Sequence, residues 1–211
     1  MCGIAGVIDS SGKLNVNLLE KMSEVIKHRG PDDKGIYFDK ENGMGLVHRR
    51  LSIIDLTSGH QPMESESGNS LIVFNGEIYN YRELREGLAK SGARFKTNSD
   101  TEVILSAYEM YDTESFDMLN GIFAFAIYDK RKRKLIIARD CFGVKPLYYS
   151  FTSGGITFGS EIKAILCNED YKAELDYTAF NSFLTYRYNP SPQTLFKNIF
   201  NVFFRVLFFL F

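Results

Sequence analysis

The sequence predicts an α+β protein in which β-sheets are covered by helices on both sides. Short apolar runs bounded by turn residues recur along the chain, as at residues 4–8 and 71–74, and such runs predict buried strands. Segments with helical periodicity lie before, between and after them. The 211 residues, 45% hydrophobic and 24% charged, suffice for one well-packed domain, or one domain with a fragment attached.

The first helix is expected shortly after the strand at residues 4–8. Four apolar residues share one helical face: Leu18, Met22, Val25 and Ile26. Asn15 or Asn17 can cap its start, and the Gly-Pro pair at residues 30–31 ends it, because proline cannot continue a helix.

The middle of the chain is predicted to contain three strands, two helices and a polar loop. The bounds are residues 35–38, 45–48 and 71–74 for the strands, 81–90 and 102–108 for the helices, and 57–69 for the loop. Asn75-Gly76 follows the third strand. This dipeptide is the strongest turn signal in the chain, so the strand is predicted to end there.

The last third is predicted to be rich in strands, with a final helix. The bounds are residues 122–128, 135–138, 147–150 and 156–158 for the strands and 161–167 for the helix. A basic run occupies residues 130–134, but no aromatic residue is interleaved with it and the net charge is -1. A solvated hairpin loop is therefore favoured, and no nucleic-acid partner is expected.

Composition also bears on location and cofactors. The three cysteines, Cys2, Cys141 and Cys167, are too widely spaced for a disulfide framework, and they suit a reducing, cytoplasmic compartment. The histidines lack the spacing of a zinc site, so we expect no metal. No phosphate-binding glycine loop and no secretory signal are recognisable.

Cys2 is the strongest candidate for chemistry. Once Met1 is trimmed, Cys2 carries a thiol and a free α-amine, so one residue supplies both a nucleophile and a group that can accept its proton. The buried strand behind it would hold the sulfur rigidly. The alternative is an ordinary small residue at a frayed terminus, and this stretch alone favours that alternative.

Three polar clusters could serve such a nucleophile. Arg50 follows a strand and could grip a carboxylate with both arms of its fork. Asn75-Gly76 could stabilise an oxyanion, while Glu77 and Asp100 suit an ammonium group. Taken singly, each is better explained otherwise: a surface ion pair for Arg50, a hairpin turn for Asn75-Gly76 and a helix cap for Asp100.

Six blocks of sequence together resemble a known family. They are MCGIAG at residues 1–6, HRGPD at 28–32, HRRLSIID at 48–55, FNGEIYN at 74–80, SDTE at 99–102 and ARDCFGVKPLYY at 138–149. They are similar to the N-terminal glutaminase domain of glutamine-hydrolysing asparagine synthetases, a class II glutamine amidotransferase and N-terminal nucleophile hydrolase. The HRGPD block favours this family over sugar-phosphate and purine amidotransferases.

The resemblance implies a fold and a set of roles. The implied fold is a four-layer αββα sandwich of two antiparallel sheets. Cys2 would be the nucleophile, its α-amine the general base, and Asn75 with Gly76 the oxyanion hole. The implied substrate-binding residues are Arg50, Leu51, Ile53, Glu77 and Asp100.

The implied reaction converts glutamine to glutamate and ammonia through a γ-glutamyl thioester. No cofactor is implied for this part of the family. The ammonia would pass to a synthetase domain or chain, where ATP and Mg²⁺ serve the amidation of aspartate to asparagine. Glutamine and that synthetase part are the expected partners, a homodimer stays open, and a membrane is not expected.

The likeness covers residues 2–199, and its last hairpin is expected to be missing. Residues 200–211 are rich in phenylalanine without helical periodicity, and no Ser-Gly-Gly-x-Asp-Ser signature of a synthetase domain occurs. We interpret the chain as truncated or frameshifted, with a poorly packed tail. A membrane anchor is disfavoured, because a spanning helix needs about 20 apolar residues and this tail carries Arg205. An inactive remnant and another amidohydrolase of the same fold remain as alternatives.

Overall fold

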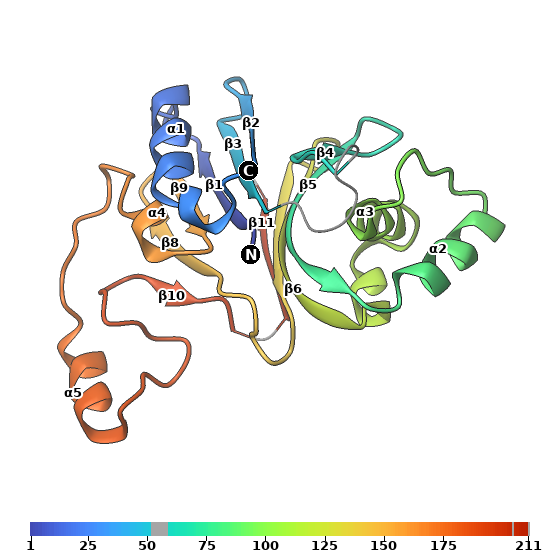
Figure 1. Ribbon diagram of the computed structural model, residues 1–211. Helices are drawn as coiled ribbons and strands as arrows, with labels where there is room; N and C mark the ends of the chain where they lie inside the picture. The colour runs from blue at the N-terminus through green and yellow to red at the C-terminus, as the bar shows by residue number, and fades with distance from the viewer. Residues whose placement is uncertain (52–58, 204, 211) are drawn as a thin grey trace.

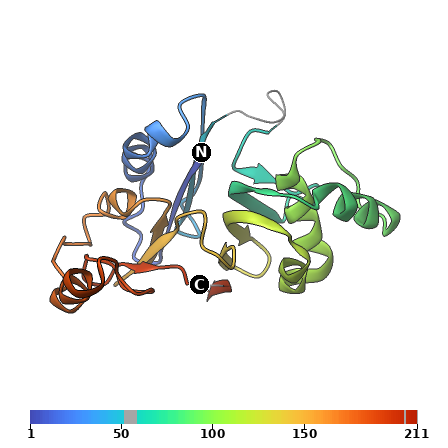
Figure 2. The same ribbon diagram turned by 60° about the horizontal axis from the view of Figure 1, so that its bottom comes forward.

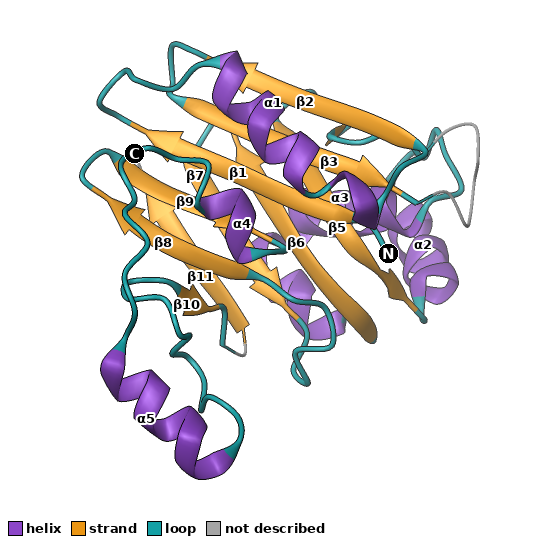
Figure 3. Cartoon of the chain, turned by 60° about the vertical axis from the view of Figure 1, so that its left-hand side comes forward, coloured by secondary structure: helices purple, strands orange, loops and turns teal. Residues whose placement is uncertain are grey.

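Two antiparallel sheets pack face to face between two layers of helices (Figures 1 and 3). The computed structural model describes residues 1–51, 59–203 and 205–210. The predicted α+β sandwich with helices on both outer sides is confirmed. Central strands such as residues 3–9 and 121–129 are buried on both faces, which explains why they read as nearly continuous apolar runs.

The first sheet has the strand order β10-β8-β9-β1-β3-β2. Its strands are β1 (Gly3–Asp9), β2 (Asp33–Asp39), β3 (Met44–Arg50), β8 (Tyr148–Thr152), β9 (Gly155–Gly159) and β10 (Phe200–Asn201). The helices α1 (Val16–Val25) and α4 (Ile162–Ile165) cover its outer face, and the short 3-10 turn η1 (Lys27–Arg29) follows α1.

The second sheet has the strand order β11-β7-β6-β5-β4. Its strands are β4 (Met63–Glu64), β5 (Ser70–Ile78), β6 (Gly121–Asp129), β7 (Lys134–Arg139) and β11 (Arg205–Leu210). On its outer face lie α3 (Asp100–Tyr111) and the 3-10 segment η2 (Asp112–Met118), with α2 (Tyr81–Lys90) packed against α3. The helix α5 (Tyr177–Tyr186) lies apart from both sheets and buries Ala179 (Figure 1).

The core between the sheets leads directly to a polar end. On β3, Met44 and Leu46 face this core, and on β5 Leu71 and Val73 do so. Side chains of a strand alternate between its two faces, so the next inward residues fall at every second position. These residues are polar on both strands, namely His48 and Arg50 on β3 and Asn75 and Glu77 on β5. The two inner faces therefore become polar toward the same end of the sandwich.

Asn75-Gly76 does not form the predicted turn. The strand β5 continues to Ile78, and Gly76 pairs in register with Phe123 of β6. A β-carbon on Gly76 would lie 2.3 Å from the carbonyl oxygen of Ile122. Glycine is needed here because the neighbouring backbone comes so close. The turn predicted at Asn75-Gly76 is therefore wrong.

The cap of α1 is Asn15, as predicted, whereas α3 is capped by Ser99 and not by Asp100, which is the first residue of that helix. Asn15 accepts the N–H of Leu18 at 3.0 Å and starts α1, and Ser99 accepts the N–H of Thr101 at 3.1 Å and starts α3. The elements β4, η2 and α5 were not predicted. β4 interrupts the loop predicted at residues 57–69, of which residues 57 and 58 lie outside the described part.

The C-terminal residues pair with the sheets. β10 pairs with β8, and β11 runs antiparallel to β7 from Arg205 opposite Arg139 to Leu210 opposite Lys134. The backbone of residues 205–210 thus forms an edge strand, where the sequence suggested a poorly packed tail. Within residues 1–51, 59–203 and 205–210, no helix combines the length and the apolar character needed to cross a membrane.

The close approach at Gly76 predicts a large stability effect. Gly76→Ala should lower the free energy of unfolding by about 1–3 kcal/mol, because backbone atoms cannot move aside for a methyl group. Gly87→Ala in α2 is the matched control, since nothing lies within 4 Å of its β-carbon position. It should raise stability by about 0.5–1 kcal/mol. Urea unfolding measures both, and equal effects would contradict this account of Gly76.

Candidate active site

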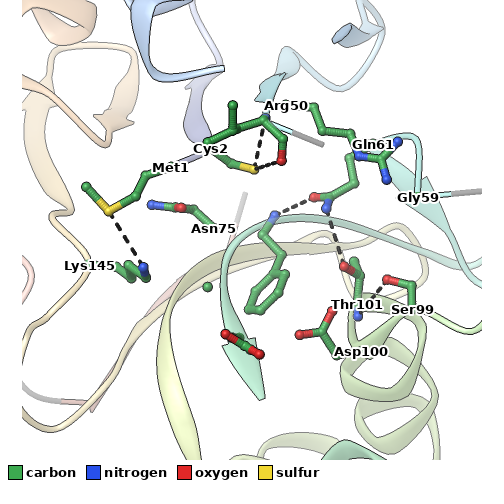
Figure 4. Close-up of a pocket in the computed structure, with 14 residues that line it drawn as sticks. Met1, Cys2, Arg50, Gly59, Gln61, Asn75, Ser99, Asp100, Thr101 and Lys145 are labelled. Carbon is green, nitrogen blue, oxygen red and sulfur yellow. Dashed lines mark hydrogen bonds between the residues drawn. The ribbon is translucent and has the colours of Figure 1, made fainter. Parts of the chain in front are cut away.

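A pocket of about 160 Å³ opens at the polar end between the two sheets (Figure 4). The start of β1, the end of β3, the strand β5 and the first residues of α3 contribute to it. All but one of the predicted site residues line it, namely Cys2, Arg50, Leu51, Asn75, Gly76, Glu77 and Asp100. Ile53, the remaining prediction, lies outside the described residues. Figure 2 shows the N-terminus between the two halves of the sandwich.

The sulfur of Cys2 is held by the backbone of Leu51. The Leu51 N–H donates to Cys2 Sγ at 3.4 Å, and the Leu51 carbonyl lies 3.8 Å from the same sulfur. Behind the sulfur, Arg29 Nε donates to the Cys2 carbonyl at 3.0 Å, and Arg29 is itself paired with Glu161 at 3.1 Å. Cys2 is therefore an ordered residue, in contrast to the frayed terminus that the isolated N-terminal stretch favoured.

Met1 occupies part of the same pocket. It lines the cavity beside Cys2, and its sulfur lies 3.6 Å from Lys145 Nζ (Figure 4). While Met1 is attached, the nitrogen of Cys2 is a peptide nitrogen and cannot act as a base. Removal of Met1 would both free that amine and empty part of the pocket.

Asn75 presents a hydrogen-bond donor with no acceptor. The residue is 2% exposed, and within the described part of the chain its Nδ2 has no hydrogen-bond partner. A buried donor without an acceptor costs about 1–3 kcal/mol, so such a group calls for an explanation. Because this side chain lines the pocket that also contains the Cys2 sulfur, it is suited to an oxygen atom of a bound ligand.

The Gly76 N–H also faces the pocket, as the strand pairing shows. Phe123 is the register partner of Gly76 on β6, and its N–H and C=O both bond to Asp140, at 3.1 and 2.8 Å. Phe123 consequently makes no ladder bond to Gly76. Gly76 must therefore direct its own N–H and C=O away from β6, toward the open edge of β5 where the pocket lies.

Among the described residues, the charged side chains that line the pocket are those of Arg50, Lys145, Glu77 and Asp100. Arg50 is 7% exposed and lines the pocket with Glu77 and Asp100. Burial raises the pKa of Asp100, and the nearby charge of Glu77 acts in the same direction. Asp100 Oδ2 accepts the N–H of Ile78 at 3.1 Å, which orients the carboxylate. A bound ammonium group would favour the charged form of Asp100 and offset the cost of its burial.

Several pocket residues were not predicted, and Gln61 is the most connected of them. Its Oε1 accepts the Phe74 N–H at 2.6 Å, and His48 Nε2 donates to the Phe74 carbonyl at 3.1 Å. Gln61 lies in the segment that the sequence assigned to a polar loop, and no spacing pattern marks it. Thr101 and Lys145 fall inside blocks of the family resemblance, which was the available signal for them.

Comparison with solved structures identifies the class of fold. A glutamine phosphoribosylpyrophosphate amidotransferase from B. subtilis, in complex with ADP and GMP, superposes with a TM-score of 0.64. That likeness covers 79% of this chain and 43% of the other at 21% identity. At this level of identity, the match supports the α+β sandwich fold alone.

Sequence comparison is more specific. Residues 1–204 match the model of the glutamine amidotransferase domain, and the chain belongs to that family. Asparagine synthetase [glutamine-hydrolyzing] 1 of Bacillus subtilis is 42% identical over 92% of this chain. Putative asparagine synthetase [glutamine-hydrolyzing] 2 of Methanocaldococcus jannaschii is 38% identical over 96% of it. The chain spans 31% and 42% of the lengths of these two relatives, respectively.

The buried His48 predicts a pH dependence of stability. Burial lowers the pKa of His48 to about 4, below the 6.5 that is usual for a histidine in water. Between these values the unfolded chain binds the proton and the folded chain does not, so stability falls as the pH falls. From pH 6.5 to about pH 4.5 the loss attributable to His48 should be about 2–3 kcal/mol.

Comparison with His48→Gln isolates this effect, because glutamine can still donate to the Phe74 carbonyl but does not titrate. Urea unfolding at the two pH values should give a shallower dependence for the variant. Identical pH dependences of the two proteins would show that His48 is not held neutral by the fold.

Proposed function

We propose that this protein hydrolyses the side-chain amide of glutamine to glutamate and ammonia, with Cys2 as the nucleophile after removal of Met1. One observation supports this most directly. The Cys2 sulfur shares a pocket with the buried Asn75 amide, which has a donor without an acceptor among the described residues. An electron-rich sulfur beside such a donor is the arrangement that attack on a carbonyl requires.

In the proposed first step, the sulfur attacks the amide carbon while the freed α-amine of Cys2 takes the thiol proton. The carbonyl oxygen becomes an oxyanion, which the Asn75 Nδ2–H and the Gly76 N–H stabilise. The α-ammonium then returns the proton to the leaving nitrogen. The C–N bond breaks, ammonia departs and a γ-glutamyl thioester remains on Cys2.

In the second step, water attacks the thioester carbon and the same α-amine removes a proton from it. The oxyanion forms again at Asn75 and Gly76. The C–S bond then breaks, the sulfur recovers its proton and glutamate leaves. The sum is one water consumed for one ammonia released, with no redox change and no metal.

The charged groups of the pocket suit the head group of an amino acid. Arg50 would bind the α-carboxylate, because its guanidinium can donate two parallel hydrogen bonds. Asp100 and Glu77 would bind the α-ammonium. The backbone of Leu51 would keep the sulfur oriented, and we assign Ile53 to the same binding region by family resemblance.

We further propose that the ammonia serves an asparagine synthetase. The relatives named above carry that name and are longer than this chain. A separate domain or chain in the cytoplasm would consume ATP with Mg²⁺ to amidate aspartate. Among the described residues, no group of three or more His, Cys, Asp or Glu side chains could hold an ion.

Ammonia release from glutamine tests the proposed function. Protein with Met1 removed, verified by mass spectrometry, should release ammonia and glutamate in equal amounts. Protein with an uncleaved N-terminal extension should be inactive, because the base is then a peptide nitrogen, and Cys2→Ala should be inactive for want of a nucleophile. Full activity with the extension would refute the base assignment.

The same assay separates the alternatives. A folded, processed protein that releases no ammonia would favour the inactive remnant. Preferential hydrolysis of another amide, in competition with glutamine, would favour a different amidohydrolase.

Two variants should separate catalysis from binding. Asn75→Ala removes an oxyanion donor and should lower kcat by about 10²–10³-fold with a small change in KM. Arg50→Met removes a group remote from the scissile bond and should chiefly raise KM for glutamine. Steady-state kinetics on both variants check this contrast. Normal turnover by Asn75→Ala would exclude it from the oxyanion hole.

A further inference from the structure

Gln61 connects two parts of the pocket through a single buried side-chain amide. The residue is 6% exposed and lines the cavity. Its oxygen accepts the Phe74 N–H at 2.6 Å, and its nitrogen donates to Thr101 Oγ1 at 3.3 Å (Figure 4). Both ends of the amide are therefore engaged, one with β5 and the other with the start of α3.

The contact with Phe74 holds a part of β5 with which, in the described part of the chain, no strand pairs on the β4 side. The short strand β4 pairs only with Leu71 and Ile72, so the backbone of Phe74 lies beyond the ladder on that edge. Gln61 Oε1 accepts a hydrogen bond from the Phe74 N–H, and His48 Nε2 donates one to the Phe74 carbonyl. Phe74 directly precedes Asn75, so these two hydrogen bonds fix the backbone that carries the proposed oxyanion donors.

The contact with Thr101 holds the residue next to the proposed ammonium-binding carboxylate. Thr101 is 2% exposed and follows Asp100 at the start of α3. Ser99 accepts the Thr101 N–H at 3.1 Å. A shift of Thr101 would therefore displace Asp100, because both belong to the same first turn of the helix.

The backbone of Gln61 is itself wedged against the first sheet. A β-carbon on Gly35 of β2 would lie 1.8 Å from the Gln61 carbonyl oxygen. The residue is thus placed by one sheet while its side chain bridges two elements of the other half. Gln61 is therefore fixed at both its backbone and its side chain, so it can hold β5 and the start of α3 in place relative to each other.

We propose that Gln61 is a positioning residue that sets the distance between the oxyanion donors on β5 and the Asp100 carboxylate, and so determines selectivity for amides that carry an α-ammonium group. The inference rests on the proposed glutaminase function and extends it to substrate choice. Gln61 itself acts through Phe74 and Thr101, and no direct contact with the substrate is required of it.

A pair of substrates tests this role. Glutamine and 4-carbamoylbutanoate carry the same amide and carboxylate, but the second lacks the α-ammonium. Gln61→Met keeps the length of the side chain and removes both hydrogen bonds. The ratio of kcat/KM for glutamine to that for 4-carbamoylbutanoate should fall about tenfold or more, because small displacements in a site cost such factors. A general loss of folded protein lowers both rates and leaves the ratio unchanged.

Thr101→Val is a second variant that breaks one arm of the bridge. It removes the acceptor at α3 and leaves the Phe74 contact intact. The ratio should fall as in Gln61→Met, while hydrolysis of 4-carbamoylbutanoate stays near that of the wild type. Gln61→Glu should retain more of the ratio than Gln61→Met, since a carboxyl group can accept from Phe74 and also bond to the Thr101 hydroxyl.

Two controls separate positioning from stability. Tyr108→Phe, near the C-terminal end of α3, removes a buried 2.9 Å hydrogen bond to Asp129, and Tyr108 does not itself line the pocket. It should destabilise the fold and leave the ratio unchanged. In an Asp100→Asn background, Gln61→Met should cause no further fall in the ratio, because the carboxylate that it positions is already gone.

The outcomes distinguish the two proposals. Processed wild-type protein that releases no ammonia from glutamine overturns the proposed function and this inference with it. An active wild type whose ratio is unchanged in both Gln61→Met and Thr101→Val overturns the inference alone. A fall in both variants, absent in Tyr108→Phe, supports it.

Discussion

The face-to-face packing of the two sheets is the constraint on which the rest of the structure depends. Side chains alternate along each strand, so the inner faces of β3 and β5 form the core in their middle and the pocket at their ends. The hydrogen bond from His48 to the Phe74 carbonyl crosses between the sheets at the boundary of these two regions. Core and site are therefore parts of one interface, and the register of the strands places the site residues.

Hydrogen bonding along the open edge of β5 shows how the pocket combines rigidity with available donors. The Phe74 N–H donates a hydrogen bond to the Gln61 side chain, and the Ile78 N–H donates one to the Asp100 carboxylate. Between them, the Asn75 side chain has a buried donor with no partner in the described part of the chain. The strand is thus held on both sides of the group that would meet the ligand. A buried donor without an acceptor lowers the stability of the fold, and such groups are expected in sites that bind a ligand.

Much of the fold could be predicted because local signals and tertiary structure agree. The periodic apolar face of α1 and its Asn15 cap lie where the sequence placed them. Asn75-Gly76 is the instructive exception. Its dipeptide signal describes a turn, but the approach of Ile122 decides that Gly76 lies within a strand. Gln61 could not be predicted, because its partners come from two elements that are distant in sequence.

The sequence by itself determined which chemical groups are available and in what order. It placed a cysteine behind the first methionine, a cation at the end of β3, an amide donor on β5 and a carboxylate at the start of α3, and its blocks pointed to one family. Only the tertiary structure decided that these groups share a pocket, that the Asn75 donor lacks a partner there and that Gln61 bridges β5 and α3. The reason is physical: residue identity and spacing act locally, whereas distances across two packed sheets are set by strand register and by the burial of both faces.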